Sequence, residues 1–435
     1  MKNNSISRIR NYILIISILT VLISFKSSNQ WSTLPIGNDL LWWIIQAIFI
    51  YILFKIKNHF SNPSIETNLK YINIYLIWNV ICIVRGAFIA ENYWEWKFLI
   101  AHGFLLLLPL IVYLAKSFKS VLIIVKTWFQ YGLILFIFFS PFLWGDAVGK
   151  FLIPISFLLL FLPVLNTKWK FIVIIFSVYA ITFDITARSN VIKFIVPFMI
   201  SCLYYLKNII HIRVFNLIRL LLLFIPFILL LLGLIGIFNV FKLDEYLGEQ
   251  KTKTISITGE KGEENLTSDT RTFLYIEVIE SALKHDYVLF GRTPARGNDS
   301  NSFGDYNKET LKIGKQERFS NEVSILNIFT WLGIIGVIIY FLIFYKSSYL
   351  AINDSNNIFI KLIGINVSFR WTYGFVEDFS NFDLSNIFLW LMIGMCFSKT
   401  FRQMSNSQMK NWILSIFDIK KKYPRSLLKP IRPSN

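Results

Sequence analysis

Apolar segments long enough to cross a lipid bilayer recur along almost the whole of this 435-residue chain. Crossing the hydrocarbon takes about 20 apolar residues, or about 17 at the short end. Within lipid, backbone polar groups must be paired inside the spanning structure, which helices achieve and open sheets do not. The pattern therefore predicts an all-α polytopic membrane protein, and the low share of charged residues, 16%, fits that class.

The apolar segments predict about twelve transmembrane helices. Their approximate bounds are Tyr12–Phe25, Leu40–Phe54, Tyr71–Ala90, Phe98–Ala115, Val121–Trp144, Phe151–Leu165, Phe171–Phe183, Val191–Leu206, Phe215–Phe241, Val323–Tyr345, Ile358–Phe375 and Asn386–Phe397. The chain then divides into helices 1 to 9 at residues 1–241, a large external loop at 242–322, helices 10 to 12 at 323–398 and a basic tail at 399–435. Because no small-residue cleavage site follows the first segment, we expect an uncleaved span there and not a signal peptide.

The formal net charge of +18 has a simpler origin than nucleic-acid binding, because the basic residues cluster beside the apolar segments and in the tail. Lys and Arg that flank spans hold the adjoining loops in the cytoplasm. When the N-terminus is placed inside, the connectors on its side carry several times as many basic residues as the short connectors opposite. We therefore expect a multi-pass membrane protein with both termini cytoplasmic, the long loop outside and no nucleic-acid partner.

The polar stretch from Phe241 to Asn321 is the largest interruption of the apolar pattern. Its first part, Lys251 to Thr270, is short of large apolar residues, which predicts a mobile segment. A helix is predicted from about Arg271 to His285, with Asp269 or Thr270 as its cap. The residues of this helix that partly fit an amphipathic stripe are Phe273, Leu274, Ile276, Ile279 and Leu283. The segment FGRTPARGNDSNSFGD that follows is rich in turn-forming residues.

Several arginines gather at the face that this topology places outside. They are Arg85, Arg188, Arg292, Arg296, Arg318 and Arg370. Arginine at membrane depth is costly and usually lies in a protein interior or an aqueous cavity. Guanidinium groups bind phosphate oxygens through paired hydrogen bonds, so this cluster suits a lipid-linked diphosphate. Taken one at a time, each arginine is also explained by snorkelling to the interface or by an ion pair with an acid.

Glu322 stands where the polar loop meets the next apolar segment. A carboxylate at a membrane surface suits a general base whose pKa is set by burial and by nearby arginines. The alternative explanation is an acid that meets the positive end of the helix dipole at a helix start. Other acids expected on the outer side, where they would pair with arginines or orient a sugar hydroxyl, are Asp184, Glu377, Asp378 and Asp383.

Several other chemistries lack their sequence patterns. The cysteines, Cys82, Cys202 and Cys396, all lie in apolar segments and give neither a disulfide framework nor a metal-binding spacing. No glycine-rich phosphate loop, Ser-His-Asp arrangement or Asp-x-Asp motif is present in the sequence. We therefore expect no metal and no cofactor, and the missing Asp-x-Asp motif argues against a metal-dependent transferase.

Short motifs accompany the long external loop that precedes the last spans. They are the turn Thr186-Ala187-Arg188-Ser189, the segment Gly291-Arg292-Thr293-Pro294-Ala295-Arg296-Gly297, and the junction Ser320-Asn321-Glu322 that leads to Gly333-Ile334-Ile335-Gly336. With these features the chain resembles the O-antigen polymerase and ligase family. The architecture extends over the whole chain, whereas the motifs cover a small part of it.

The resemblance implies a GT-C-like, inverting, metal-independent glycosyltransferase that takes glycan from undecaprenyl diphosphate at the periplasmic face. It implies that Arg188 and either Arg292 or Arg296 hold the diphosphate. Ligases of the family carry a His-Asn pair at the junction, and Glu322 falls at or next to that histidine position. This departure favours a polymerase with Glu322 as the base. The implied partners are a lipid-linked glycan donor and acceptor and membrane lipid, with a chain-length regulator protein as a further candidate.

Three alternatives to a polymerase stay open at this point. The first is a ligase that transfers the glycan to lipid A-core. The second is a flippase for lipid-linked oligosaccharides, which would need charges in a mid-membrane cavity and often shows repeat symmetry. This chain has no evident repeat, and its charges crowd the outer ends of the predicted spans. The third is a structural or sensory membrane protein with an external ligand-binding loop.

Overall fold

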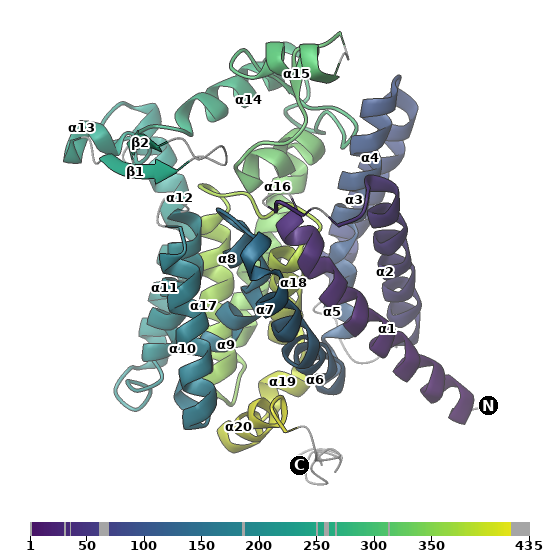
Figure 1. Cartoon of the computed structure of the whole chain (residues 1–435), viewed down its shortest axis with the longest axis vertical. Coiled ribbons are helices and arrows are strands. Elements are labelled where there is room, and N and C mark those ends of the chain that lie inside the picture. The colour runs from purple at the N-terminus through teal and green to yellow at the C-terminus, as the bar shows by residue number, and fades with distance from the viewer. Residues whose placement is uncertain are drawn as a thin grey trace.

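The computed structural model describes residues 2–29, 32–34, 36–60, 69–184, 188–248, 251–255, 261–265, 268–311 and 314–418. Long helices run side by side along one axis, and the elements of the long loop gather at one end of this bundle (Figure 1). The start of α1 (Lys2–Ser28) and α20 (Asn406–Ser415) lie toward the opposite end. Which side of a membrane each end faces stays a prediction.

The described chain contains seven helical stretches long and apolar enough to cross a membrane. They are Arg8–Ser28, Asp39–Asn58, Lys70–Ile89, Tyr93–Leu114, Phe118–Phe142, Ile212–Leu234 and Ser324–Asn353. In order, they belong to α1, α2 (Asp39–Phe60), α3 (Lys70–Ile89), α4 (Tyr93–Leu106) with α5 (Ile111–Leu114), α6 (Phe118–Thr127) with α7 (Leu133–Phe139), α12 (Ile212–Leu234) and α16 (Ser324–Asn353). The chain is therefore a mainly helical protein with the composition of a multi-pass membrane protein.

The other predicted spans correspond to shorter helices, so the count of twelve stays a prediction. These helices are α8 (Ala147–Phe151), α9 (Ile153–Leu159), α10 (Thr167–Thr182), α11 (Arg188–Cys202), α17 (Ile358–Tyr373) and α18 (Leu384–Phe397). The predicted span Phe151–Leu165 is divided because Pro154 begins a new helix and Pro163 lies in a short 3₁₀ turn.

Burial separates a central helix from helices that could face lipid. Every residue of α18 is buried, and α16 and α17 pack against it. By contrast, α3 exposes an apolar stripe at intervals of three and four residues, which fits one lipid-facing side. This stripe consists of Ile74, Ile77, Ile81, Val84 and Phe88. After α18, the short α19 (Lys399–Gln403) leads to α20; basic residues of the predicted tail beyond 418 lie outside the described residues.

The external loop is more ordered than its polar sequence predicts. After α13 (Leu243–Leu247), the antiparallel strands β1 (Lys251–Ile255) and β2 (Lys261–Asn265) occupy part of the stretch predicted to be mobile. The rest of the loop consists of α14 (Thr272–Lys284), α15 (Gly304–Leu311) and the paired strands β3 (Asn298–Asp299) and β4 (Glu317–Arg318). Residues 256–260 and 266–267 of the predicted mobile stretch lie outside the described residues.

The predicted loop helix is present as α14, and its predicted apolar stripe is divided between the packed and the exposed sides of the helix. Asp269 Oδ1 accepts hydrogen bonds from the amides of Arg271 and Thr272, which confirms Asp269 as a residue that caps the helix start. The buried side of α14 consists of Leu274, Glu277, Val278, Ser281 and Ala282. Of the predicted stripe, only Leu274 is buried, and Ile276, Ile279 and Leu283 are exposed.

The hydrogen bonds of Glu277 explain which side of α14 is packed against the loop. Its Oε1 accepts hydrogen bonds from the amides of Asn301 and Ser302 and from the Ser302 hydroxyl, and its Oε2 accepts one from Ser300. These contacts hold a carboxylate on the packed side of α14. The apolar residues on the other side of the helix are therefore left outside, because polar packing within the loop overrides the hydrophobic stripe.

Candidate functional site

A network of amide side chains fixes the junction between the loop and α16. Asn327, in the first turns of α16, accepts a 2.6 Å hydrogen bond from the amide of Asn321 and donates to the Asn321 carbonyl and to Ser380 Oγ, both at 2.9 Å. Asn321 in turn donates to Asn298 Oδ1 at 2.9 Å. Three chain segments far apart in the sequence are thereby held together next to Glu322.

Glu322 lies between two arginines at this junction. Its Oε2 is 2.5 Å from Arg271 Nη1, and its Oε1 is 3.3 Å from Arg318 Nη2. The Glu322 side chain is 55% exposed, whereas those of Arg271 and Arg318 are 19% and 12% exposed. The N-cap residue of α16 is Val323, whose side chain makes no capping hydrogen bond. The carboxylate is therefore engaged by guanidinium groups, and its role as a base stays a prediction.

Both arginines are held in place by groups other than Glu322. Arg271 donates from Nε to the Val376 carbonyl at 3.2 Å and from Nη1 to the Thr270 carbonyl at 3.1 Å. Arg318 donates from Nε to the Ser320 carbonyl at 3.1 Å, and its guanidinium lies 4.3 Å from the centre of the Phe303 ring. Arg318 Nη1 is buried without a hydrogen-bond acceptor among the described residues. The sequence-based site included Arg318 but not Arg271.

Arg292 and Arg296 are closed off by acids of the same loop. Arg292 contacts Asp299 at 2.9 Å and Glu317 at 3.3 Å. Arg296 forms a two-pronged pair with Glu317, through Nε at 3.0 Å and through a second, shorter contact from Nη2. The Glu317 side chain is only 4% exposed, and Glu95 of α4 lies 3.7 Å from Arg296. These guanidiniums therefore tie the loop together in the structure as it stands.

Asp299 belongs to the same closed cluster. Its neighbours are Lys284, His285 and Arg292, each of which forms a hydrogen bond with its carboxylate. Burial opposes ionisation of Asp299, but these hydrogen bonds outweigh burial and lower its pKa to about 2. The carboxylate is therefore ionised throughout the physiological pH range.

The two glycine motifs meet through their backbones. Gly291 and Gly333 both have positive φ, 71° and 69°, and Gly333 breaks the helical conformation inside α16. The amides that the break releases find acceptors in the loop: Ile334 donates to the Val288 carbonyl at 2.9 Å, and Arg292 donates back to the Thr330 carbonyl at 2.6 Å. A Cβ atom on Gly291 would lie 2.5 Å from the backbone of residues 331–333. The glycines are required because loop and helix are joined backbone to backbone.

Arg85 supports this backbone junction. From α3, it donates to the Phe290 carbonyl at 2.8 Å and to the Gly291 carbonyl at 3.3 Å. Trp78 of the same helix donates to the Leu332 carbonyl at 3.0 Å. Irregular backbone near a membrane needs protein partners of this kind for its polar groups.

The remaining predicted arginines lie within the helix bundle. Arg370 of α17 is 7% exposed, donates to Ser385 Oγ at 2.8 Å and lies 4.3 Å from the centre of the Phe379 ring. Arg188 is the exposed first residue of α11, and residues 185–187 of its predicted turn lie outside the described residues. The structure thus brings Arg318 beside Glu322 but distributes the other predicted arginines over separate surroundings.

A second polar cluster lies at the loop end of the bundle, and sequence reasoning named its member Glu377 but missed Lys193 and Asp146. Lys193 Nζ lies 3.7 Å from both Asp146 and Glu377 and donates to Ser189 Oγ at 2.8 Å. Burial raises the pKa of Glu377, against the opposing effect of Lys193. A lysine inside a predicted span was a usable signal, since such charges seldom lie there without a partner.

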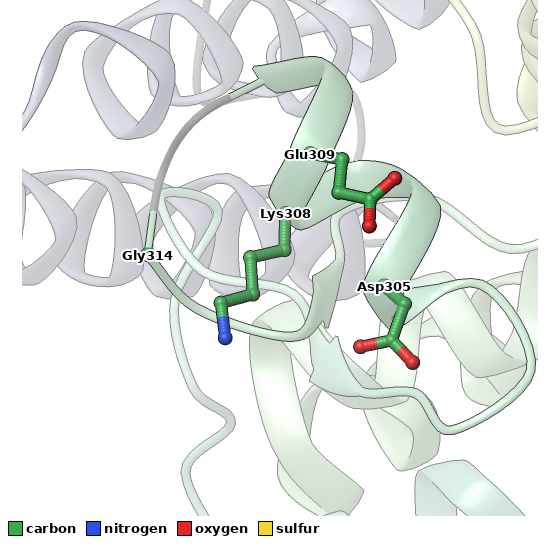
Figure 2. A pocket seen from close by; sticks show the side chains of 4 residues that line it. All are labelled: Asp305, Lys308, Glu309 and Gly314. Carbon is green, nitrogen blue, oxygen red and sulfur yellow. The ribbon is translucent and has the colours of Figure 1, made fainter.

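Figure 2 shows a separate hollow over α15, lined by Asp305, Lys308, Glu309 and Gly314. None of the sequence-predicted site residues lines it. In the part of the chain that the structure describes, no three His, Cys, Asp or Glu side chains gather in a group able to hold a metal ion. The junction around Glu322 is therefore the candidate site for the predicted chemistry.

No protein-family model, curated protein or solved structure matches this chain.

Proposed function

We propose that this protein is a GT-C-like membrane glycosyltransferase that polymerises undecaprenyl-diphosphate-linked repeat units into an O-antigen or capsule-type polysaccharide. The observation that carries the proposal is Glu322, a half-exposed carboxylate bracketed by two anchored arginines where the loop enters α16. A carboxylate beside fixed cationic donors is what glycosyl transfer from a diphosphate needs at its reacting centre. The proposal places this reaction at the outer face of the bacterial inner membrane.

In the proposed reaction, a hydroxyl of the acceptor glycan attacks the anomeric carbon of the donor glycan. Glu322 takes the hydroxyl proton as the new glycosidic bond forms. The bond between the anomeric carbon and the diphosphate oxygen breaks, and its electron pair leaves with undecaprenyl diphosphate. Guanidinium donors that are already in position stabilise the charge that grows on the leaving group. This single displacement inverts the configuration at the anomeric carbon.

Arg318 is the predicted arginine best suited to hold the diphosphate. It already contacts an anion, and its Nη1 has no acceptor among the described residues. Arg292 and Arg296, in contrast, would have to leave buried carboxylates before they could bind a substrate. Roles in diphosphate binding stay predictions for Arg85, Arg188, Arg292, Arg296 and Arg370.

A glycan ladder tests the proposal. The gene is deleted in its host and complemented with wild type, with Glu322→Gln or with Glu280→Gln, a matched change at an exposed glutamate of α14. We expect the deletion and Glu322→Gln to leave a single repeat unit on the lipid carrier or on lipid A, and Glu280→Gln to restore the ladder. If long polymer instead accumulates on undecaprenyl diphosphate and never reaches its acceptor, the protein is a ligase and the proposal is wrong.

A further inference from the structure

Both oxygens of Glu322 are occupied, which conflicts with a base that is ready to act. Oε2 is bound by Arg271 and Oε1 by Arg318. Protonation of the carboxylate would forfeit two charge-assisted hydrogen bonds, the stronger class of such bonds. A base at this position therefore first has to be released from the arginines.

The arginines are the fixed partners in this contact, and Glu322 is the exchangeable one. Arg271 is pinned by the Val376 and Thr270 carbonyls, and Arg318 by the Ser320 carbonyl and the Phe303 ring. None of these contacts involves Glu322, whose own side chain is the most exposed of the three. Two guanidiniums thus converge on one point from different parts of the loop, with or without the carboxylate.

Charge and hydrogen bonding leave this point with unused capacity for an anion. Two guanidiniums share the Glu322 carboxylate, with Glu277 and Glu377 as further acids nearby, and Arg318 Nη1 lies buried without an acceptor among the described residues. A diphosphate carries more negative charge than a carboxylate and more oxygens for guanidinium groups to bind. It would therefore compete effectively with Glu322.

We propose that Arg271 and Arg318 form the binding site for the donor diphosphate, and that Glu322 occupies this site as an internal ligand until the donor arrives. The inference rests on the proposed function and adds Arg271 to its residues. Displacement by the diphosphate frees the Glu322 carboxylate beside the bound donor, so the base becomes available only when the leaving group is in place. Arrival of the donor and release of the base are one event in this scheme.

Binding measurements on the full-length protein in nanodiscs test the scheme without any turnover. The probes are inorganic pyrophosphate and undecaprenyl diphosphate, each titrated against wild type, Glu322→Gln, Arg271→Ala, Arg318→Ala and the control Glu280→Gln. We expect Glu322→Gln to bind both probes about tenfold more tightly, a change that corresponds to about 1.4 kcal/mol. Each arginine variant should lose measurable binding, and Glu280→Gln should match wild type. Thermal unfolding of each variant confirms that it is folded.

Equal or weaker binding by Glu322→Gln would overturn the internal-ligand role, and unchanged binding by either arginine variant would overturn the site. Undecaprenyl diphosphate should bind more tightly than pyrophosphate at the same salt concentration. Equal affinities would mean that a soluble diphosphate is the ligand, against a lipid-linked donor. The glycan ladder is independent of these results. Tighter binding by Glu322→Gln together with a ladder that gene deletion leaves unaltered would keep Arg271 and Arg318 as a diphosphate site with Glu322 as its internal ligand, and would reject the polymerase.

Discussion

Two pairs of arginines in one loop differ in what neutralises them. Arg292 and Arg296 face Glu317, whose side chain is 4% exposed, together with Asp299. Arg271 and Arg318 share Glu322, whose side chain is 55% exposed. The first pair is matched by acids of the loop and by Glu95 of α4, whereas the second shares one carboxylate that solvent reaches. An arginine-rich motif in a sequence therefore indicates anion binding, but the anion can be a carboxylate of the protein itself or a ligand.

The energetic scales of the two pairs are also different. Removing one partner from a buried ion pair costs about 3–5 kcal/mol, because a charge is left buried and unpaired. Exposed ion pairs contribute about 0–1 kcal/mol. The Arg292–Arg296 pair should therefore govern whether the loop folds, and the Arg271–Arg318 pair should govern what the folded loop binds.

The largest effect is expected from Glu317→Gln. This change removes the buried carboxylate that Arg292 and Arg296 share and leaves them only Asp299 and Glu95 as charge partners, so we expect a loss of roughly 3 kcal/mol of stability. The measurement is the amount of monodisperse protein in mild detergent and its thermal unfolding midpoint. Unfolding at the wild-type temperature would show that the closed cluster has no structural role and would remove the contrast between the pairs.

Arg318→Lys and Arg271→Lys should reduce polymerisation per folded molecule by roughly 10²-fold, because lysine keeps the charge but loses the fork of a preorganised donor. The measurement is polymer formed from purified lipid-linked repeat units, normalised to folded protein. Arg292→Lys is the matched control from the other pair, and its activity per folded molecule should stay near wild type. A greater loss for Arg292→Lys than for Arg318→Lys would reverse the assignment.

Glu322→Gln should change stability by less than about 1 kcal/mol, since it alters an exposed pair. Its thermal unfolding midpoint should lie close to that of wild type, even though its polymerisation is expected to be lost. Raising the salt concentration should bring the two midpoints still closer, because salt screens exposed charges. A severe loss of folded protein would instead make Glu322 a structural residue, and both arginine pairs would then serve the stability of the loop.

The smallest effect concerns pH. The pKa of Asp299 in the folded loop is about 2, below the value of about 3.9 for an unfolded chain. A carboxyl with a lowered folded-state pKa stabilises the fold above about pH 4, and this contribution is lost as the pH falls through about 2. Asp299→Asn should therefore flatten the acid limb of the stability profile. An acid limb identical to that of wild type would contradict the closed cluster.

The mainly helical architecture was predictable because bilayer thickness imposes a length on apolar segments, and α3 lies within one residue of its predicted bounds at each end. The partners of the arginines were not predictable in the same way. Arg271 and Glu322 are 51 positions apart, and Arg296 and Glu317 are 21 apart, so no local spacing rule connects them. The packed face of α14 could not be predicted for a related reason, because the donors that bind Glu277 come from a turn 23 to 25 residues away.

The backbone hydrogen bonds that join the loop to α16 beside Gly291 and Gly333 set an order of assembly. Residues 288–292 precede α16 in the chain, and the amide of Ile334 has its acceptor, the Val288 carbonyl, only when these residues have docked against the helix. The hydrogen bonding of α16 is therefore completed only when the loop is in place. A chain whose loop failed to dock would carry an interrupted helix with unpaired amides, so α16 depends on the loop for its own backbone hydrogen bonds.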